Sequence, residues 1–280
     1  MSSFIVAAVL FGALLHAVWN ALIKAQGDRF GAAMLVAIGA GIIGLPAIVY
    51  FPAPPPEAWP YIVASSVIHV GYFALVGYAY RHADLGVAYP LTRGSAPFFT
   101  AILAFLLVGE ALPWNGWLAV VCIAFGIVAL SADALMRGGL TWSTGAAAIA
   151  NAAVIVLYTL IDGLGARVMG NGIAYGAWMV AGTGLLLLIF VAAFNRRTLT
   201  ENAARRWPLA LICGVLVLGS YGIALWAMTR SPIGLVASLR ETSVLIAAIL
   251  GAVFFHEPFG PKRWLALGFI VGGIVLLRLV

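Results

Sequence analysis

The chain carries very little charge. Only 9% of its 280 residues are Asp, Glu, Lys or Arg, whereas 64% are hydrophobic. Soluble domains are about 25% charged and about 45–50% apolar, and surface-to-volume scaling leaves much of a soluble domain's surface in water. The composition therefore excludes an ordinary soluble protein and predicts that this chain resides in a lipid bilayer.

Cysteine and clustered basic residues are also scarce. The two cysteines, Cys122 and Cys213, lie inside apolar runs, which predicts small hydrophobic side chains rather than a disulfide or a metal site. The net charge of +6 comes from basic residues scattered between apolar runs, so we expect no nucleic-acid partner. The first apolar run follows Met1 closely without a basic segment, so we expect no cleaved signal peptide.

Motifs of the common enzyme classes are missing. The sequence has no nucleophile elbow, HExxH pair or Walker lysine, so we expect neither an enzyme nor a cofactor, and no ATP hydrolysis by this chain. The stretch from Gly39 to Gly44 spells G-x-G-x-x-G, but it lies within an apolar run with no strand before it. It therefore does not predict nucleotide binding.

What the chain has in abundance is long apolar runs. A helix needs about 20 apolar residues to cross the hydrocarbon core. Ten such segments occur, at about 4–24, 31–51, 58–80, 86–108, 114–132, 143–165, 173–194, 207–229, 234–255 and 263–279. The runs are continuous and do not alternate as the strands of a membrane β-barrel do. The sequence therefore predicts an all-α membrane protein with ten transmembrane helices.

The two halves of the chain resemble each other. A shift of 148 residues, and then of 147, aligns Glu, Trp, Ser and Gly in the same order. The aligned pairs include Gly71 with Gly219, Ser95 with Ser243, Glu110 with Glu257, Trp117 with Trp264, and Gly126 with Gly273. Five helices per half give the second half the opposite orientation in the membrane. We therefore predict two inverted five-helix repeats, 1–138 and 139–280, around a central cavity, a pattern typical of secondary transporters.

Lys and Arg are distributed unevenly between the two sides of the predicted bundle. The odd-numbered connections between helices carry ten of them, and the even-numbered connections together with the C-terminus carry only three, Arg167, Arg230 and Arg278. The positive-inside rule places the odd-numbered connections in the cytoplasm. Both termini are then predicted to lie on the non-cytoplasmic side.

Two charged residues lie at repeat-related positions inside predicted helices. Arg93, in YPLTRGSAP, aligns with Glu241, in SLRETSVL. A charge at mid-bilayer costs about 2.5–3.5 kcal/mol on the insertion scale, so such residues persist when they are paired or face a wet cavity. We predict that the two form an acid/base pair that lines the cavity; an ion pair that only joins two helices is the alternative. Arg240 lies about 100° further round a regular helix and is predicted to act near the membrane face.

Further candidates are polar or aromatic residues within apolar helices. His16, Trp19 and Asn20 share one helix face and either bind a ligand or join helices by hydrogen bonds. Asp162 is either a gating residue or a helix end on the cytoplasmic side. The predicted binding residues are Arg93, Glu241, His16, Trp19, Asn20, Tyr89, Tyr158, His69, Tyr72 and Ser243, with Pro90, Pro97 and Asp162 in structural or gating roles.

Two of the remaining candidates are the prolines that bracket Arg93. Pro90 and Pro97 remove backbone hydrogen bonds and are expected to kink the helix, although proline is common in membrane helices in general. Glu110 and Glu257 lie at predicted helix ends and are expected to tie adjacent loops together.

These motifs resemble the drug/metabolite transporter superfamily, and its EamA-type branch in particular. Each half has an apolar run ending in Glu, LLVGE at 106–110 and FFHE at 254–257, before a Gly-rich last helix. YPLTRGSAP and SLRETSVLIAAILG look like the fourth and ninth helices of that family, and HAVWN and YTLIDGLGAR like its first and sixth. The resemblance covers nearly the whole chain. The sequence departs at Trp19-Asn20, where the aromatic amino-acid exporters of the family tend to have Trp-Ser.

The resemblance implies a basket of ten helices in the bacterial cytoplasmic membrane that moves small metabolites by alternating access. We therefore predict a secondary transporter that exports a small polar or amphiphilic metabolite, an amino acid or related amine. Arg93 would pair with a carboxylate, Glu241 and an aromatic residue would hold an amine, and His16, His69 or Glu241 would couple transport to protons. A lipid-linked sugar flippase and a non-transporting membrane scaffold are the alternatives. The expected partners are the substrate and the lipid bilayer. We expect the protein to be a monomer or a homodimer.

Overall fold

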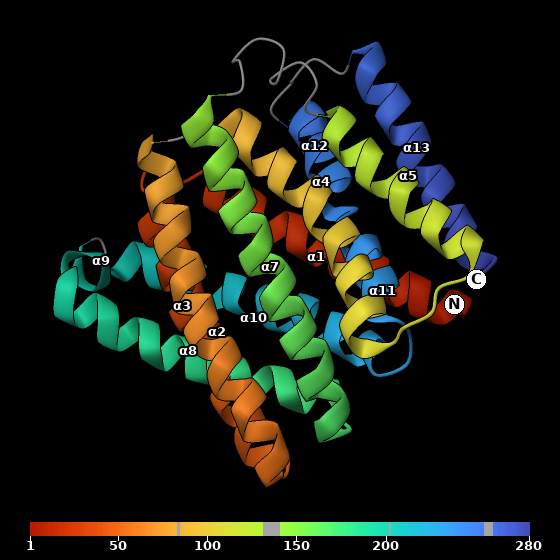
Figure 1. Ribbon diagram of the computed structural model, residues 1–280. Coiled ribbons are helices and arrows are strands. Elements are labelled where there is room, and N and C mark those ends of the chain that lie inside the picture. The colour runs from red at the N-terminus through yellow and green to blue at the C-terminus, as the bar shows by residue number, and fades with distance from the viewer. Residues whose placement is uncertain (83–84, 131–140, 202, 255–259) are drawn as a thin grey trace.

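The computed structural model is helical across the part of the chain that it describes (Figure 1). It describes residues 1–82, 85–130, 141–201, 203–254 and 260–280, without the side chains of 24, 74, 76–82, 85–91, 143–144, 147, 203–204, 251–252, 254 and 261–262. The helices of the first half are α1 (Ser3–Lys24), α2 (Arg29–Tyr50), η1 (Pro56–Ala58), α3 (Trp59–His82), α4 (Leu85–Leu103), the π-helical turn η2 (Ala104–Val108) and α5 (Trp114–Leu130). Those of the second half are α7 (Trp142–Met169), α8 (Gly172–Phe194), α9 (Arg197–Thr200), α10 (Ala203–Met228), α11 (Ile233–Arg240), α12 (Ser243–Phe254) and α13 (Pro261–Arg278).

These helices confirm the predicted all-α membrane fold. Six helices in the described residues are long and apolar enough to cross a membrane, and 92–108 and 114–130 form two shorter apolar helices. Each of the ten predicted segments corresponds to one helix or to one interrupted helix, with ends displaced by a few residues. The ninth predicted segment is the interrupted one, because it is divided into α11 and α12 at Glu241–Thr242.

Several helix ends follow from the sequence nearby. The side chain of Ser2 accepts a hydrogen bond from the amide of Ile5 at the start of α1, and Asp28 does the same for Gly31 in α2. Asn171 caps α8 in the same way. Such caps satisfy amides that lack a partner within the helix. Helices therefore begin at short polar residues that also mark the connections between membrane segments.

The two halves of the chain pack against each other in matched pairs. Helix α2 lies against α8, and α5 lies against α13. Helix α1 packs on α10 as α7 packs on α3, so corresponding helices exchange partners between halves. Two related halves produce this pattern. The division at residue 138 and the inverted relation of the repeats themselves stay predictions.

The glycine-rich stretch of α2 allows close contact between helices. A Cβ atom added to Gly41 would lie 2.8 Å from the Cα atom of Gly184 in α8. One added to Gly39 would lie 2.6 Å from the carbonyl oxygen of Ala210 in α10. Small residues at such positions let membrane helices approach backbone to backbone. The G-x-G-x-x-G spacing in this chain therefore has a packing role in the structure.

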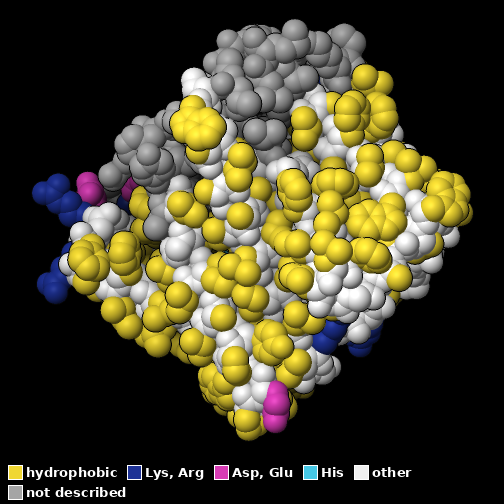
Figure 2. Space-filling model, in the orientation of Figure 1, with side chains coloured by type: hydrophobic (Ala, Val, Ile, Leu, Met, Phe, Trp, Pro, Cys, Tyr) yellow, Lys and Arg dark blue, Asp and Glu magenta, His cyan; other side chains and the backbone are white. Residues whose placement is uncertain are grey.

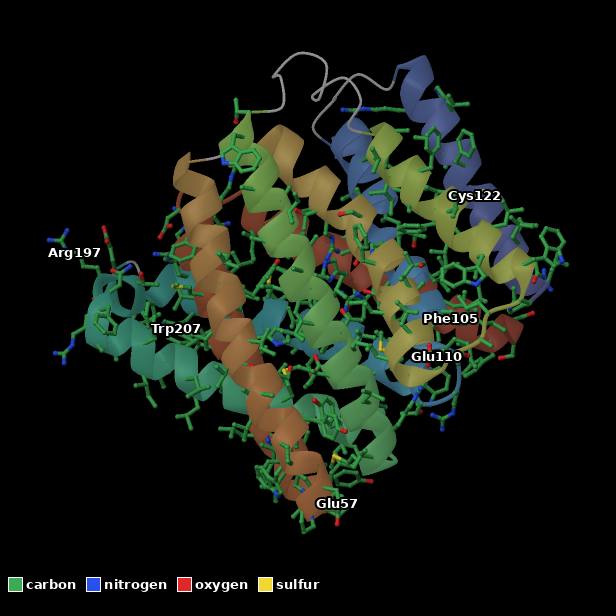
Figure 3. All side chains as sticks on the ribbon, in the orientation of Figure 1. Glu57, Phe105, Glu110, Cys122, Arg197 and Trp207 are labelled. Atoms are coloured by element: carbon green, nitrogen blue, oxygen red, sulfur yellow. The ribbon has the colours of Figure 1, made fainter. Side chains whose placement is uncertain are left out.

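The outer surface of the bundle is apolar. Val49 and Trp142 are about nine-tenths exposed, and many other large hydrophobic side chains also face outward. Figure 2 shows hydrophobic side chains spread over the visible face, with Lys and Arg at its left edge and at its lower right. Arg197, the first residue of α9, projects at the left edge (Figure 3). An apolar belt with charge at its margin is the surface that a membrane requires.

The α2–α8 contact leads to a prediction about stability. Gly41→Ala should lower the free energy of unfolding by about 1–3 kcal/mol, because the new methyl group meets backbone that cannot move aside locally. Gly268→Ala is the matched control, since a Cβ there meets nothing within 4 Å. The control should be neutral or slightly stabilising, because alanine favours helix more than glycine does. Unfolding in mixed detergent micelles measures both, and equal stabilities would contradict the packing role of Gly41.

Candidate functional site

A partly open cavity of about 140 Å³ lies between helices of the two halves. Seven of the predicted site residues line it, and they come from α1, α3, α4 and α7. Those seven are His16, Trp19, Asn20, His69, Tyr72, Arg93 and Tyr158. Four polar residues that were not predicted to bind also line it, namely Thr183, Ser220, Tyr221 and Arg240.

The cavity extends from the middle of the bundle toward one side. Helix α1 contributes residues 16–20, close to its C-terminal end, and α2 contributes residues 33–40, in its first half. Helix α3 contributes residues 69–73, at its middle, and α10 contributes residues 217–221, just past its middle. The cavity therefore reaches toward the side of the connection at 25–28, which the positive-inside rule predicts to be cytoplasmic.

Arg93 and Glu241 form a buried ion pair beside this cavity. The Nε atom of Arg93 lies 2.7 Å from Oε2 of Glu241, and the two side chains are 5% and 3% exposed. The Nη2 atom of Arg93 also lies 2.9 Å from Nε2 of His16 and 3.4 Å from Oγ of Ser243. The structure thus shows the contact that the repeat alignment predicts, and it adds His16 and Ser243 to it.

Arg240 lies in the same cluster, so its predicted place near the membrane face is wrong. Its side chain is 5% exposed, and its Nη2 atom lies 3.6 Å from Oε1 of Glu241. Its guanidinium carbon lies 5.4 Å from the ring centroid of Tyr221, within the range of cation–π attraction. Glu241 is thus placed between two arginines that both line the cavity, while Glu241 does not line it.

The interruption between α11 and α12 explains how two adjacent charges can share one site. The amides of Thr242 and Val244 donate to the carbonyl oxygens of Leu239 and Glu241, three residues back along the chain. A regular α-helix uses bonds to the fourth residue back, so the backbone is tightened locally at Glu241. The prediction for Arg240 assumed a regular helix through this point. Interrupted helices of this kind commonly form the sites of membrane transporters.

The predicted stripe on α1 faces the cavity and contacts Arg93. The ring of His16 packs edge-on against Trp19, with centroids 5.0 Å apart, and the side-chain amide of Asn20 donates to the carbonyl oxygen of His16. Arginine has only donors, so Nε2 of His16 must be the acceptor in its contact with Arg93. The buried indole nitrogen of Trp19 has no hydrogen-bond partner among the described residues. It is a free donor in the wall of the cavity.

Asp162 lies beneath the cavity and is completely buried. The hydroxyl groups of Tyr175 and Tyr221 each donate to one of its carboxylate oxygens, the first at 2.8 Å. The alternative prediction of a helix end on the cytoplasmic side is wrong. Helix α7 continues to Met169, and its end leads to the connection before Gly172, on the side away from the cavity.

A second polar cluster lies near that far end of α7. Arg167 forms an ion pair with Glu110 and also donates to the backbone oxygens of Met228 and Ser231. The other carboxylate oxygen of Glu110 accepts from the amide of Ile233, at the start of α11, at 2.8 Å. Glu110 therefore ties α7 to α11, as expected of a residue that joins loops, and Figure 3 shows it beside the lower end of the helix formed by α4 and η2. Glu257 lies outside the described residues.

Six of the predicted residues are not among those that the structure places in the cavity wall. Glu241 and Ser243 contact Arg93, and Asp162 is bound by the cavity-lining Tyr221. The side chains of Tyr89 and Pro90 lie outside the described part of the chain. Helix α4 is continuous from Leu85 to Leu103 and includes Pro97, so the gating role of that proline stays a prediction.

The repeat contained a signal for two of the missed residues. Tyr72 and Phe73 in α3 align, at the same shift of 148, with Ser220 and Tyr221 in α10, and all four line the cavity. For metal binding, the described residues hold no group of three His, Cys, Asp or Glu side chains that could bind an ion. The described chemistry of the cavity is therefore that of guanidinium, hydroxyl, imidazole and aromatic groups.

The whole chain also matches known proteins. The model of the EamA-like transporter family matches residues 3–132 and again residues 142–279. The chain belongs to the EamA-like transporter family. The two matches leave out only a short stretch between the halves, and they agree with a ten-helix membrane transporter whose architecture is repeated twice.

Individual relatives are more distant. The chain is 29% identical over 212 residues to Uncharacterized protein PA1977 of Pseudomonas aeruginosa, covering 74% of this chain and 69% of that protein. It is 32% identical over 77 residues to the "Probable 4-amino-4-deoxy-L-arabinose-phosphoundecaprenol flippase subunit ArnE" of Escherichia coli, covering 26% of this chain and 68% of ArnE. A solved crystal structure has a TM-score of 0.75 with 19% identity, covering 99% of this chain and 96% of that one. At that identity the likeness shows the fold alone.

The ion pair leads to a prediction about coupling. Removing one partner of a buried pair costs about 3–5 kcal/mol, because the other charge is left uncompensated. Arg93→Met and Glu241→Met should therefore each lower the free energy of unfolding strongly. The double variant should be destabilised less than the sum of the two, with a coupling of about 0.5–3 kcal/mol. Unfolding of all four proteins in mixed micelles gives this value, and simple additivity would show that the pair is not coupled.

Proposed function

We propose that this EamA-like protein is a secondary transporter that exports a small carboxylate-bearing metabolite, of the amino-acid class, across the bacterial inner membrane. One observation carries the proposal. Two guanidinium groups, those of Arg93 and Arg240, line a cavity whose other walls are largely aromatic and apolar. In a family of membrane transporters, the cavity at the interface of the two halves is where the substrate is expected to bind.

The charges of the cavity favour a carboxylate. Glu241 supplies one negative charge to two arginines, so the group of three keeps one positive charge. Glu241 does not line the cavity, whereas both arginines do. A carboxylate that enters would therefore meet cationic donors first, and guanidinium groups bind carboxylates with good geometry. We propose that Glu241 pairs with both arginines in the empty site. When the substrate binds, its carboxylate replaces Glu241 in some of these hydrogen bonds.

The aromatic walls suit the rest of an amino acid. Trp19, Tyr72, Tyr158 and Tyr221 present ring faces and polar tips to the cavity. Such rings bind an ammonium group through cation–π attraction, which replaces the amine-binding role first expected of Glu241. The indole N–H of Trp19 is buried and unpartnered among the described residues, so a turn of its ring would make this donor available to the substrate.

The far side of the bundle has the features of a closed gate. The cluster of Arg167, Glu110 and the start of α11 joins helices of both halves on the side away from the cavity. Alternating access requires one side to be closed while the other is open. We propose that this cluster closes the non-cytoplasmic side here, and that it separates when the cavity turns to face that side.

Binding of carboxylates provides a direct test. In a thermal-shift screen of purified protein, amino acids should stabilise the protein, whereas the corresponding amines without a carboxylate should have little effect. Arg240→Gln should weaken binding about ten- to hundredfold, since a charged hydrogen bond contributes about 1.5–3 kcal/mol. Arg206→Gln, which removes a charge that pairs with Asp28 outside the cavity, is the matched control. Stabilisation by amines alone would contradict the carboxylate proposal.

Accessibility tests the proposed gate. Ala37 lines the cavity, and a cysteine at this position should react with a membrane-impermeant thiol reagent applied from the predicted cytoplasmic side. Reaction from the other side should be slow, and Glu110→Gln should accelerate it, because the loss of the Arg167 pair favours opening there. The background is protein in which Cys122 and Cys213 are replaced by alanine. Equal reaction from both sides in the presence of Glu110 would show that the cluster is not a gate.

The match to ArnE supports a second candidate, a flippase of lipid-linked sugars. It covers about a quarter of this chain, and the whole-chain family match does not specify the cargo. A flippase would give no thermal shift with water-soluble amino acids and would instead be stabilised by an undecaprenyl phosphate sugar. The same screen therefore separates the two candidates when such a lipid is included.

A further inference from the structure

The described residues contain two buried carboxylates in the membrane interior, and their surroundings differ sharply. Glu241 is held between two arginines. Asp162 is 0% exposed and is held by the hydroxyl groups of Tyr175 and Tyr221. Among the described residues, no Lys, Arg or His nitrogen lies within 4.0 Å of Asp162. An ionised carboxylate without an adjacent cation is costly in the bilayer, so such groups bind protons or carry other functions.

The groups that face Asp162 come from every major helix around it. Helix α8 presents Tyr175, and α10 presents Tyr221. Helix α3 presents Ser65 and His69, and Ser65 Oγ lies 3.2 Å from Nδ1 of His69. That imidazole nitrogen also lies 2.9 Å from the carbonyl oxygen of Ser65. The arginine side chains of the neighbouring helices are engaged elsewhere, with Arg93 on Glu241 and Arg167 on Glu110.

A short route connects this carboxylate to the cavity. Tyr221 lines the cavity, and its hydroxyl group donates to Asp162. A hydroxyl group both donates and accepts, so it can pass a proton between cavity water and the carboxylate by rotating. His69 lines the cavity as well and connects to the same cluster through Ser65. The buried acid is thus one side chain away from the space where substrate is proposed to bind.

The same tyrosine links Asp162 to the charge of the cavity. The ring of Tyr221 lies beneath the guanidinium group of Arg240, and its hydroxyl group binds Asp162 on the other side. Arg93, Arg240 and Glu241 together keep one positive charge. An ionised Asp162 compensates this charge. When Asp162 is neutral, that charge is uncompensated, and its attraction for an incoming carboxylate is stronger in this environment of low dielectric constant.

We propose that Asp162 is the proton-binding site of this transporter, and that a proton on Asp162 and a carboxylate in the cavity favour each other's binding. The cargo part of this inference rests on the proposed function, while the proton site itself does not. By linkage, substrate binding must take up a proton as strongly as protonation promotes substrate binding. Proton and substrate then cross the membrane together, so export requires an outward substrate gradient that exceeds the inward force on the proton. Two of the three residues predicted to couple protons are engaged, since His16 accepts from Arg93 and Glu241 is paired with two arginines. The third, His69, belongs to the cluster around Asp162.

Infrared spectroscopy tests the proton site without any substrate. Acidifying the purified protein should produce the C=O stretching band of a protonated, buried carboxylic acid, and deuterium exchange should shift it. Asp162→Asn should lose this band, because asparagine fills the same space without a titrating group. Asp28→Asn, at a half-exposed surface carboxylate, should keep it. A band that persists in Asp162→Asn with a native melting temperature would overturn the proposal.

Transport measurements test the coupling. The protein is reconstituted in liposomes that contain a pH-sensitive dye, and a mixture of the proteinogenic L-amino acids is added outside. The wild type should acidify the lumen, and Asp162→Asn should lose acidification while it retains counterflow of labelled amino acids. Wild-type counterflow without acidification would overturn the coupling.

The two experiments also separate this inference from the proposed function. An infrared band that depends on Asp162, together with an absence of amino-acid counterflow in the wild type, would reject the proposed cargo and leave the proton site supported. Counterflow with a band that does not depend on Asp162 would reject the proton site and leave the proposed cargo supported.

Discussion

The cost of charge inside a bilayer is the constraint on which the rest of this structure depends. Arg93, Arg240 and Glu241 can remain in the membrane interior only because they neutralise one another in part and because the two arginines border a cavity. Their meeting requires α4 from one half to reach the interruption between α11 and α12 from the other. This ion pair holds the surrounding helices at fixed positions relative to one another. The cavity lies beside it, inside the bundle and away from the lipid. Fold and site follow from one electrostatic requirement.

Other polar groups surround that cluster. The aromatic and amide groups of α1 line the same cavity, Asp162 is joined to it through Tyr221, and the pair of Glu110 and Arg167 lies on the side away from it. A change of charge on Asp162 acts on Arg240 through the ring of Tyr221.

The sequence predicted the fold and much of the cavity because its strongest signals are physical. Apolar runs of membrane length located the helices, and the internal repeat aligned Arg93 with Glu241, which form an ion pair in the structure. Arg240 was misplaced because its position was derived from a regular helix, whereas the backbone tightens at Glu241. A helix end was one of the two predicted positions of Asp162, because apolar runs locate helix termini only to within a few residues. The side-chain partners of Tyr221 depend on the packing of α7, α8 and α10, which local sequence does not encode.

The contact between Gly41 and Gly184 has a mechanical consequence. At this point no side chain stands between the two helices, so a tilt about it changes no rotamer there, while Met34 and Ile38 of α2 pack against Leu187 and Val191 of α8 on one side of it. Such a joint acts as a smooth fulcrum near the middle of α2 and α8. Rocking of one half against the other about this point would leave the hydrocarbon seal intact, and the resistance to turnover would come from the ionic clusters at either side of it.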